Sequence, residues 1–175
     1  MTRWLVSHKF DKVGAKLADG HYSRRTPGSP QFMPPGETLV LRRSDDTAIW
    51  GWWRPHPAAG LEAMDGLDGW TCSIFRNTGP SLSSDLVLEA EIILAEADWL
   101  GTTAGPCGPD GMLSYIWPKK IRSPNPGWCF QVAGWTRDRW TKKKKRLLRK
   151  PLWLAGIPAC EWPRPCRGAG SPRSP

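Results

Sequence analysis

The residues best suited to bind a charged group lie where a predicted strand passes through a loop into a predicted helix. Trp70–Phe75 alternates large and small side chains and is rich in β-branched and aromatic residues, which is typical of a strand. The loop Arg76–Ser83 contains the breakers Gly79 and Pro80. The first N–H groups of a helix have no partner within the helix, and the helix dipole favours negative charge there. The pattern therefore indicates an anion site, although an ordinary connection between a strand and a helix has the same pattern.

The helix that follows this loop is predicted to begin at Ser83 or Ser84. Either serine can accept backbone N–H bonds as the N-cap. At 100° per residue, the apolar side chains share one face and the acidic side chains the other. The apolar set is Leu86, Ala90, Ile93, Leu94 and Ala97, and the acidic set is Asp85, Glu89, Glu91, Glu96 and Asp98. We therefore expect an amphipathic helix whose acidic face lies away from the core.

Short strands and helices are predicted on both sides of this segment. They are a strand at Arg3–Ser7, a helix at Lys9–Asp19 with Gly20 as its C-terminal stop, a hairpin of Thr38–Arg42 and Ala48–Trp53, a buried strand at Met112–Trp117, and a short helix with Asn125 as its cap and Pro126 at its first position. In this order the elements predict an α+β fold with a mixed sheet. The strands before and after the long helix are expected to be parallel and joined by a right-handed crossover.

The positive charge of the chain is concentrated at its end. The 175 residues carry a net charge of +9, and those from Thr136 onward contain twelve Lys and Arg against two Asp and Glu. Lys142–Arg146 is the densest basic run, and such a run favours a polyanion such as DNA through counterion release. A solvated tail that only aids solubility is the alternative. We expect a folded domain at residues 1–140 and a disordered, basic, Pro- and Arg-rich tail at residues 141–175.

The composition of the chain argues against a membrane protein, a secreted protein and a metal-binding protein. No apolar run approaches the roughly 20 residues that span a membrane, and charged residues interrupt any signal-peptide segment near the start. Neither the five cysteines nor the acidic residues have the spacing of a metal site. We therefore expect a cytoplasmic protein without a metal. The twelve tryptophans predict an aromatic core, although Trp50, Trp52 and Trp53 could instead line a groove that stacks on bases.

Several short motifs resemble those of a known superfamily. Arg76-x-x-Gly79-x-Ser81 resembles the loop with which the GNAT superfamily of N-acyltransferases holds the pyrophosphate of acyl-coenzyme A, and Asn125–Trp135 is similar to a second motif of that superfamily. His21–Arg25, Ser114–Tyr115 and Gly127–Trp135 resemble, in this order, three segments of phage Mom-type DNA-modification proteins, a divergent branch. The resemblance implies a GNAT-like mixed sheet flanked by helices, whose parallel strands splay apart so that acyl-coenzyme A enters the gap.

The resemblance also implies roles for individual residues. Acetyl-coenzyme A or another acyl-coenzyme A is the expected donor, and in Mom-type proteins the acceptor is the exocyclic amino group of adenine in DNA. His21 is the expected general base, Tyr115 the acid that reprotonates the thiolate, and backbone N–H groups near Phe75 polarise the carbonyl. Tyr22 and Ser114 complete the expected catalytic set. The residues expected to bind the coenzyme are Phe75, Arg76, Gly79, Ser81, Ser83, Ser84, Asn125 and Phe130.

Two further features bear on the acceptor. Lys119, Lys120 and Arg122 follow the expected active-site strand and suit contacts with DNA phosphates, and a base must leave the duplex to reach a buried thioester. Ile116-Trp117 stands where Mom-type proteins have Ala-Asp, so a carboxylate expected near the chemistry is missing. A catalytically inactive GNAT-like protein that binds nucleic acid or another partner is therefore the alternative.

Overall fold

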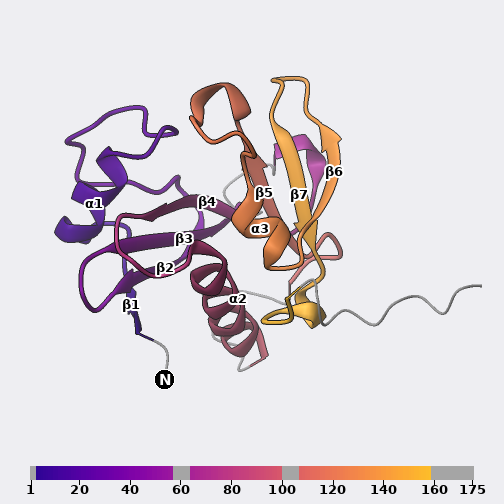
Figure 1. Cartoon of the computed structure of the whole chain (residues 1–175). Coiled ribbons are helices and arrows are strands. Elements are labelled where there is room, and N and C mark those ends of the chain that lie inside the picture. Colours follow the sequence, from indigo (N-terminus) through magenta and orange to yellow (C-terminus); the bar gives the residue numbers. More distant parts are fainter. Residues whose placement is uncertain (1–2, 57–63, 100–106, 159–175) are drawn as a thin grey trace, which may run out of the picture.

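The computed structural model describes residues 3–56, 64–99 and 107–158. These residues form an α+β fold with one seven-stranded mixed sheet, in the order β1-β2-β3-β4-β5-β7-β6 (Figure 1). The strands are β1 (Trp4–Ser7), β2 (Glu37–Arg43), β3 (Ala48–Arg54), β4 (Trp70–Asn77), β5 (Met112–Ile116), β6 (Thr136–Trp140) and β7 (Arg146–Lys150); the α-helices are α1 (Lys12–Asp19), α2 (Ser83–Trp99) and α3 (Trp128–Val132). None of the helices in the described ranges has the length and the apolar sequence of a membrane span.

The predicted mixed sheet and its hairpin are confirmed. β1 to β4 pair with their neighbours in antiparallel fashion, and β4 pairs with β5 in parallel across the connection that contains α2. β7 then pairs antiparallel with both β5 and β6. The chain thus changes from an antiparallel to a parallel pairing once, at β4 and β5.

The sheet separates two apolar clusters. On one face, Ala18 of α1 packs with Phe32 and Met33 against residues of β2, β3 and β4. On the other face, α2 and α3 pack against the sheet. Residues two apart in a regular strand share a face, but the extra residue Ser73 in β4 places Cys72 on the α2 side and Ile74 on the α1 side.

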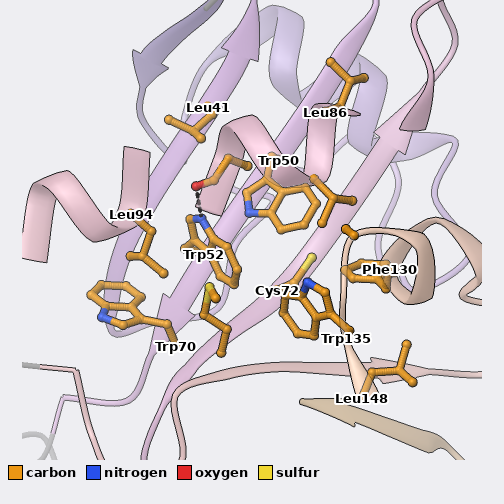
Figure 2. Close-up of a cluster of buried hydrophobic side chains, with 14 of the residues drawn as sticks. Leu41, Trp50, Trp52, Trp70, Cys72, Leu86, Leu94, Phe130, Trp135 and Leu148 are labelled. Carbon is orange, nitrogen blue, oxygen red and sulfur yellow. Dashed lines mark hydrogen bonds between the residues drawn. The ribbon is translucent and has the colours of Figure 1, made fainter. Parts of the chain in front are cut away.

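Tryptophan supplies much of the core on the α2 side (Figure 2). Trp50, Trp52 and Trp70 are fully buried. Trp52 donates from Nε1 to the carbonyl of Ala90 at 3.1 Å and stacks on Trp135 with ring centroids 6.3 Å apart. The prediction of an aromatic core is therefore confirmed. The alternative that Trp50 and Trp52 line an open groove is wrong, because neither side chain is accessible.

The expected domain boundary at residue 140 is wrong. β7 lies inside the sheet between β5 and β6, and it buries Leu147 and Leu148 completely or nearly so. The basic run before it forms the turn of the β6–β7 hairpin, with the N–H of Thr141 donating to the carbonyl of Lys145 at 2.9 Å. The folded unit therefore continues at least to residue 158, and the part of the expected tail at residues 159–175 lies outside the described residues.

The expectation that Glu91 lies on an outer acidic face is also wrong. Glu91 and Lys150 are both fully buried, with Glu91 Oε2 2.5 Å from Lys150 Nζ. Glu91 also accepts hydrogen bonds from Trp135 Nε1 and from the N–H of Gly156, while Lys150 donates to the carbonyls of Ala133 and Ile157. Burial raises the pKa of Glu91 and lowers that of Lys150, and the charge of each partner opposes the effect. The pair joins α2 to β7 and to the segment after it.

Three helix ends differ from the predicted ones. α1 begins at Lys12, because Asp11 caps it by accepting N–H bonds from Val13 and Gly14, and so it is shorter than the expected Lys9–Asp19. Gly20 has an ordinary φ of −85° and does not adopt the left-handed conformation of a typical glycine stop. α2 begins at Ser83, as predicted, although Ser83 lies inside the helix rather than before it as a cap. α3 begins at Trp128, after Gly127 with a φ of 82°, and Asn125 does not cap it.

Candidate functional site

The two central parallel strands separate after a short paired region. β4 and β5 pair only at Trp70–Met112, Thr71–Leu113 and Cys72–Ser114, after which β4 continues to Asn77 and β5 to Ile116 without pairing each other. Gly51 of β3 pairs with Ile74 whereas Trp52 pairs with Cys72, so Ser73 is an extra residue in β4. A bulge bends its strand and increases the local twist, which accounts for the separation. The far end of β4 has no strand partner on this side among the described residues.

Asn77 organises the turn between β4 and α2. Its Oδ1 accepts a hydrogen bond from the N–H of Gly79 at 3.0 Å, and its Nδ2 donates to the carbonyl of Ser81 at 2.7 Å and to Ser83 Oγ at 3.2 Å. A Cβ on Gly79 would lie 2.6 Å from Thr47 Oγ1. Gly79 is thus engaged within the turn. The Asn-x-Gly spacing is the sequence signal for this turn, since an asparagine side chain often bonds the backbone two residues later.

The first turn of α2 still offers unbonded donors. The N–H groups of Asp85 and Leu86 donate to the carbonyl of Leu82, but those of Ser83 and Ser84 donate to no acceptor within the described part of the chain. A groove of 230 Å³ lies beside this turn. Its lining residues are Arg3, Arg43, Ser81, Leu82, Asp85, Leu86 and Glu89. The groove contains both signs of charge, and Arg43 is paired there with Glu89 at 3.8 Å.

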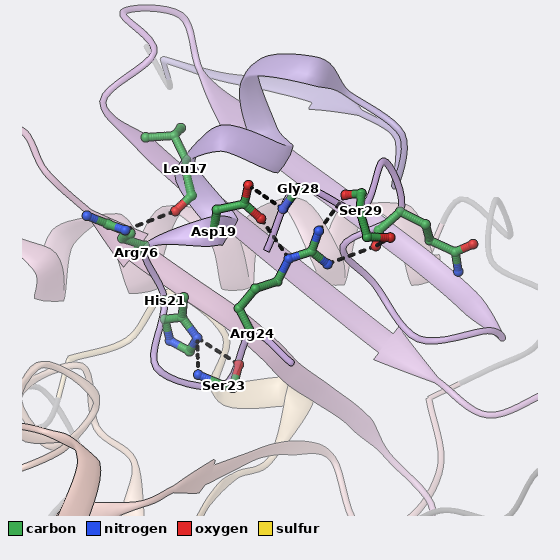
Figure 3. Close-up of polar contacts among 9 residues, drawn as sticks. Leu17, Asp19, His21, Ser23, Arg24, Gly28, Ser29 and Arg76 are labelled. Atoms are coloured by element: carbon green, nitrogen blue, oxygen red, sulfur yellow. Dashed lines mark hydrogen bonds and ion pairs between the residues drawn. The ribbon is translucent and has the colours of Figure 1, made fainter. Parts of the chain in front are cut away.

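His21 lies just after α1 and is half-buried. Its Nδ1 lies 2.7 Å from Ser23 Oγ and accepts a hydrogen bond from the N–H of Ser23 at 3.3 Å (Figure 3). Burial, and secondarily the positive charge of Arg76, lower the pKa of His21 to about 4. The imidazole is therefore neutral at pH 7, and because Nδ1 is the acceptor, Nε2 carries the proton.

Tyr22 connects this loop to the end of β5. The backbone of Trp117 forms a hydrogen bond with the phenol, and the ring centroid of Tyr22 lies 4.3 Å from that of His21. Burial raises the pKa of Tyr22 to about 12, so the phenol stays protonated at neutral pH. His21 and Tyr22 therefore interact with two different strands, although they are adjacent in sequence. His21 lies within the influence of the charge of Arg76 on β4, and Tyr22 is hydrogen-bonded to the backbone that follows β5.

Arg24 holds together the loop that carries His21 and Tyr22, so its guanidinium is engaged within the protein. Arg24 Nε donates to Asp19 Oδ1 at 2.9 Å, and its Nη atoms donate to the carbonyls of Gln31 and Ser29 (Figure 3). The other oxygen of Asp19 accepts the N–H of Gly28 at 2.9 Å. Arg24 thus fixes residues 19–31 as one folded loop.

The two expected catalytic residues of β5 lie on opposite faces of the sheet. Ser114 is buried on the α2 side, where it forms a hydrogen bond with the thiol of Cys72. Tyr115 packs with Leu113 and Leu147 on the other face. Burial raises the pKa of Tyr115 to about 12. Ser114 and Tyr115 therefore do not converge with each other on one reacting atom.

The side chains of the remaining expected coenzyme residues are packed or bonded within the protein. Phe130 is buried in the aromatic cluster, 6.1 Å from Phe75 and 5.1 Å from Trp135 between ring centroids. Asn125 accepts a hydrogen bond from Arg137 of β6 at 2.9 Å. The Arg76 guanidinium donates to the carbonyl of Leu17, at the end of α1. The structure thus brings the Ser81–Ser84 turn, Phe75 and the His21 loop to the separated ends of β4 and β5, whereas Asn125 is bonded to β6.

A basic surface flanks the same end of the sheet. Arg146 pairs with Ile116 at the end of β5, so the hairpin turn between β6 and β7 lies at that end of the sheet (Figure 1). Lys120 and Lys145 lie over the Trp117 ring at 5.6 and 5.8 Å. Burial lowers the pKa of Lys145, and the charges of Lys143 and Arg25 add to the effect. We call Arg25, Lys119, Lys120 and Lys142–Arg146 the basic rim, since it extends from the hairpin to the loop of His21.

The described residues contain no group of three or more His, Cys, Asp or Glu that could hold a metal ion. Comparisons with protein-family models, with curated proteins and with solved structures find no match for this chain.

Proposed function

We propose that this protein is an acyl-coenzyme A-dependent N-acyltransferase with a GNAT-like fold. The observation that carries the proposal is the separation of β4 and β5 directly beside the first turn of α2. The resemblance in sequence predicts such a gap between parallel strands. A loop with a neutral histidine and a protonated tyrosine adjoins both strands at this gap.

The residues at the gap fit a coenzyme A thioester in part. The unbonded N–H groups of Ser83 and Ser84 suit a diphosphate, because anions are stabilised at a helix N-terminus. The edge of β4 near Phe75 has no strand partner on the β5 side within the described ranges, so its backbone can bond an extended ligand. Arg76 does not fit the expected role, because its guanidinium is bonded to α1.

The same residues can move the protons that amine acylation requires. A bound thioester supplies an activated acyl group. Ser23 Oγ lies 2.7 Å from His21 Nδ1, so a proton from an attacking amine can pass through the serine hydroxyl to the neutral imidazole. Tyr22 replaces Tyr115 as the proton donor in this proposal, because its phenol is held at the end of β5 beside the gap.

The acceptor we propose is an amino group of a nucleic-acid base. The basic rim borders the gap, and Lys and Arg side chains bind phosphates of a nucleic-acid backbone. A base has to be unpaired or flipped to reach the gap. The adenine amino group, which the resemblance to Mom-type proteins implies, is the specific candidate.

Ser84 offers a sharp test of coenzyme binding. Replacing Ser84 by aspartate places a carboxylate where the diphosphate is proposed to bind, while a negative charge in the first turn stabilises the helix itself. We expect Ser84→Asp to bind acetyl-coenzyme A at least about tenfold more weakly than the wild type, which corresponds to about 1.4 kcal/mol of lost binding free energy. Isothermal titration calorimetry measures both affinities.

Ser84→Asn is the matched control, because asparagine has nearly the size and shape of aspartate but no charge. It should bind as the wild type does, and both variants should unfold at or above the wild-type temperature. Equal binding by Ser84→Asp and Ser84→Asn, or no binding of acetyl-coenzyme A by the wild type, contradicts the proposal.

A nucleic-acid-binding protein without catalysis is the second candidate, and the basic rim favours it. Replacing Lys142–Lys145 by glutamine should flatten the plot of log affinity for DNA against log salt by about 0.7 to 0.9 for each phosphate that is no longer neutralised. Glutamine at Lys12 and Lys16 of α1 is the control and should leave the slope unchanged. If the rim variant keeps the wild-type slope, the rim does not bind phosphate. Two results together support this second candidate. The wild type should bind DNA but not acetyl-coenzyme A, and Ser84→Asp should bind DNA with the wild-type affinity.

A further inference from the structure

Arg76 crosses from the sheet to the end of α1. It lies on β4, and its Nη1 donates to the carbonyl of Leu17 at 3.2 Å (Figure 3). The same carbonyl accepts the N–H of Gly20 at 3.3 Å. The last carbonyls of a helix carry partial negative charge, so a guanidinium is stabilised there. Arg76 therefore ties β4 to the point where α1 ends and the loop of His21 begins.

Gly20 provides the space for this contact. A Cβ at position 20 would lie 1.0 Å from Arg76 Nη1 and 2.1 Å from its Cζ. The φ of Gly20 is −85°, which any residue adopts, so the backbone itself does not require glycine. The glycine is needed because the guanidinium passes where a side chain would begin.

The next residue in the chain is the candidate base. The N–H of His21 donates to the carbonyl of Ala18 at 2.9 Å, so its backbone is fixed to the last turn of α1. The positive charge of Arg76 lowers the pKa of His21, and this effect adds to the larger effect of burial. The nearby charges of Asp19 and Arg24 are paired with each other at 2.9 Å. The neighbouring Tyr22 ring is uncharged at neutral pH.

We infer that Arg76 is a positioning residue, which uses the space at Gly20 to hold the end of α1 and thereby fixes His21 beside the gap between β4 and β5. This inference gives the arginine a role other than binding pyrophosphate. The role of His21 as a base rests on the proposed function. The contact of Arg76 with Leu17 and Gly20 does not depend on any ligand.

Proton NMR titration of the three histidines tests the inference without any coenzyme. His21 in the wild type should titrate near pH 4, and its signals are assigned with His21→Asn. Arg76→Gln should raise the midpoint by up to about one pH unit, because a nearby positive charge disfavours the imidazolium while burial, the larger cause of the low pKa, remains. Arg76→Lys keeps the charge and should remain closer to the wild type. The signals of His8 and His56 should be the same in all variants and serve as controls for the fold.

Gly20→Ala should shift the His21 midpoint in the same direction as Arg76→Gln, since the added methyl displaces the guanidinium. In the double variant Gly20→Ala/Arg76→Gln, the alanine should add no further shift, because there is no guanidinium left to displace. The inference is overturned if the His21 midpoint in Arg76→Gln equals that of the wild type. It is also overturned if Gly20→Ala shifts the His21 midpoint equally in the wild type and in Arg76→Gln. The proposed function fails separately, through the absence of acetyl-coenzyme A binding.

Discussion

Replacing Glu91 by glutamine is expected to lower the free energy of unfolding by about 3–5 kcal/mol, because Lys150 then remains buried without its carboxylate. Both side chains are fully buried, and the pair holds Trp135, Gly156 and the carbonyl of Ile157 in one network. Glutamine preserves the size of the side chain and can still accept from Trp135, but its amide nitrogen then faces the donors of Lys150 and Gly156, so the charge and an acceptor are lost together. Urea unfolding followed by tryptophan fluorescence measures the effect.

The double variant Glu91→Met/Lys150→Met is the control for this prediction. Replacing a buried ion pair by apolar side chains of similar size is often neutral or stabilising. The double variant should therefore be more stable than Glu91→Gln. If Glu91→Gln is as stable as the wild type, the buried pair in the structure is not the one that the protein forms in solution.

A chain that ends at Trp140 is expected not to fold, whereas a chain that ends at Pro158 should unfold with the cooperativity and midpoint of the full-length protein. The shorter chain lacks β7, which pairs with both β5 and β6 and carries the buried Leu147 and Leu148. It also leaves Glu91 buried without Lys150. Far-UV circular dichroism and limited proteolysis distinguish the two outcomes.

This pair of truncations separates the hairpin from the segment after it. Cooperative unfolding of the chain that ends at Trp140 would show that β7 is not needed for the sheet. A strongly destabilised chain that ends at Pro158 would instead show that residues 159–175 contribute to the fold. Either result contradicts the domain limits described above.

The central part of the fold can be predicted because its sequence patterns are local. Trp70–Phe75 and Met112–Trp117 have the composition of buried strands, and β4 and β5 lie there. The apolar positions Leu86, Ala90 and Leu94 of the long helix are buried as expected. The burial of Glu91 is not predictable in this way, because a charged residue is buried only when a partner is available, and its partner lies 59 positions away in sequence.

The strand β7 cannot be predicted from local sequence patterns for the same reason. Its two buried leucines are surrounded by basic residues, and Lys150 belongs to the core only because Glu91 faces it. The candidate site shows a similar limit. The spacing of Arg76 and Gly79 indicates an anion loop, but the side chain of Arg76 lies on the α1 face, and the turn is instead bonded around Asn77. Spacing in sequence places the backbone at a site, whereas the direction of each side chain depends on tertiary contacts.

The proposed function depends most on a ligand that bonds both the edge of β4 and the first turn of α2. Residue-resolved amide hydrogen exchange, measured by NMR with and without saturating acetyl-coenzyme A, tests this directly. The proposed function predicts slower exchange at those amides of β4 beyond Cys72 that face away from β3, and at the amides of Ser83 and Ser84. The two serine amides have no acceptor in the described part of the chain. Unchanged exchange at both places, or protection confined to another part of the protein, would contradict it.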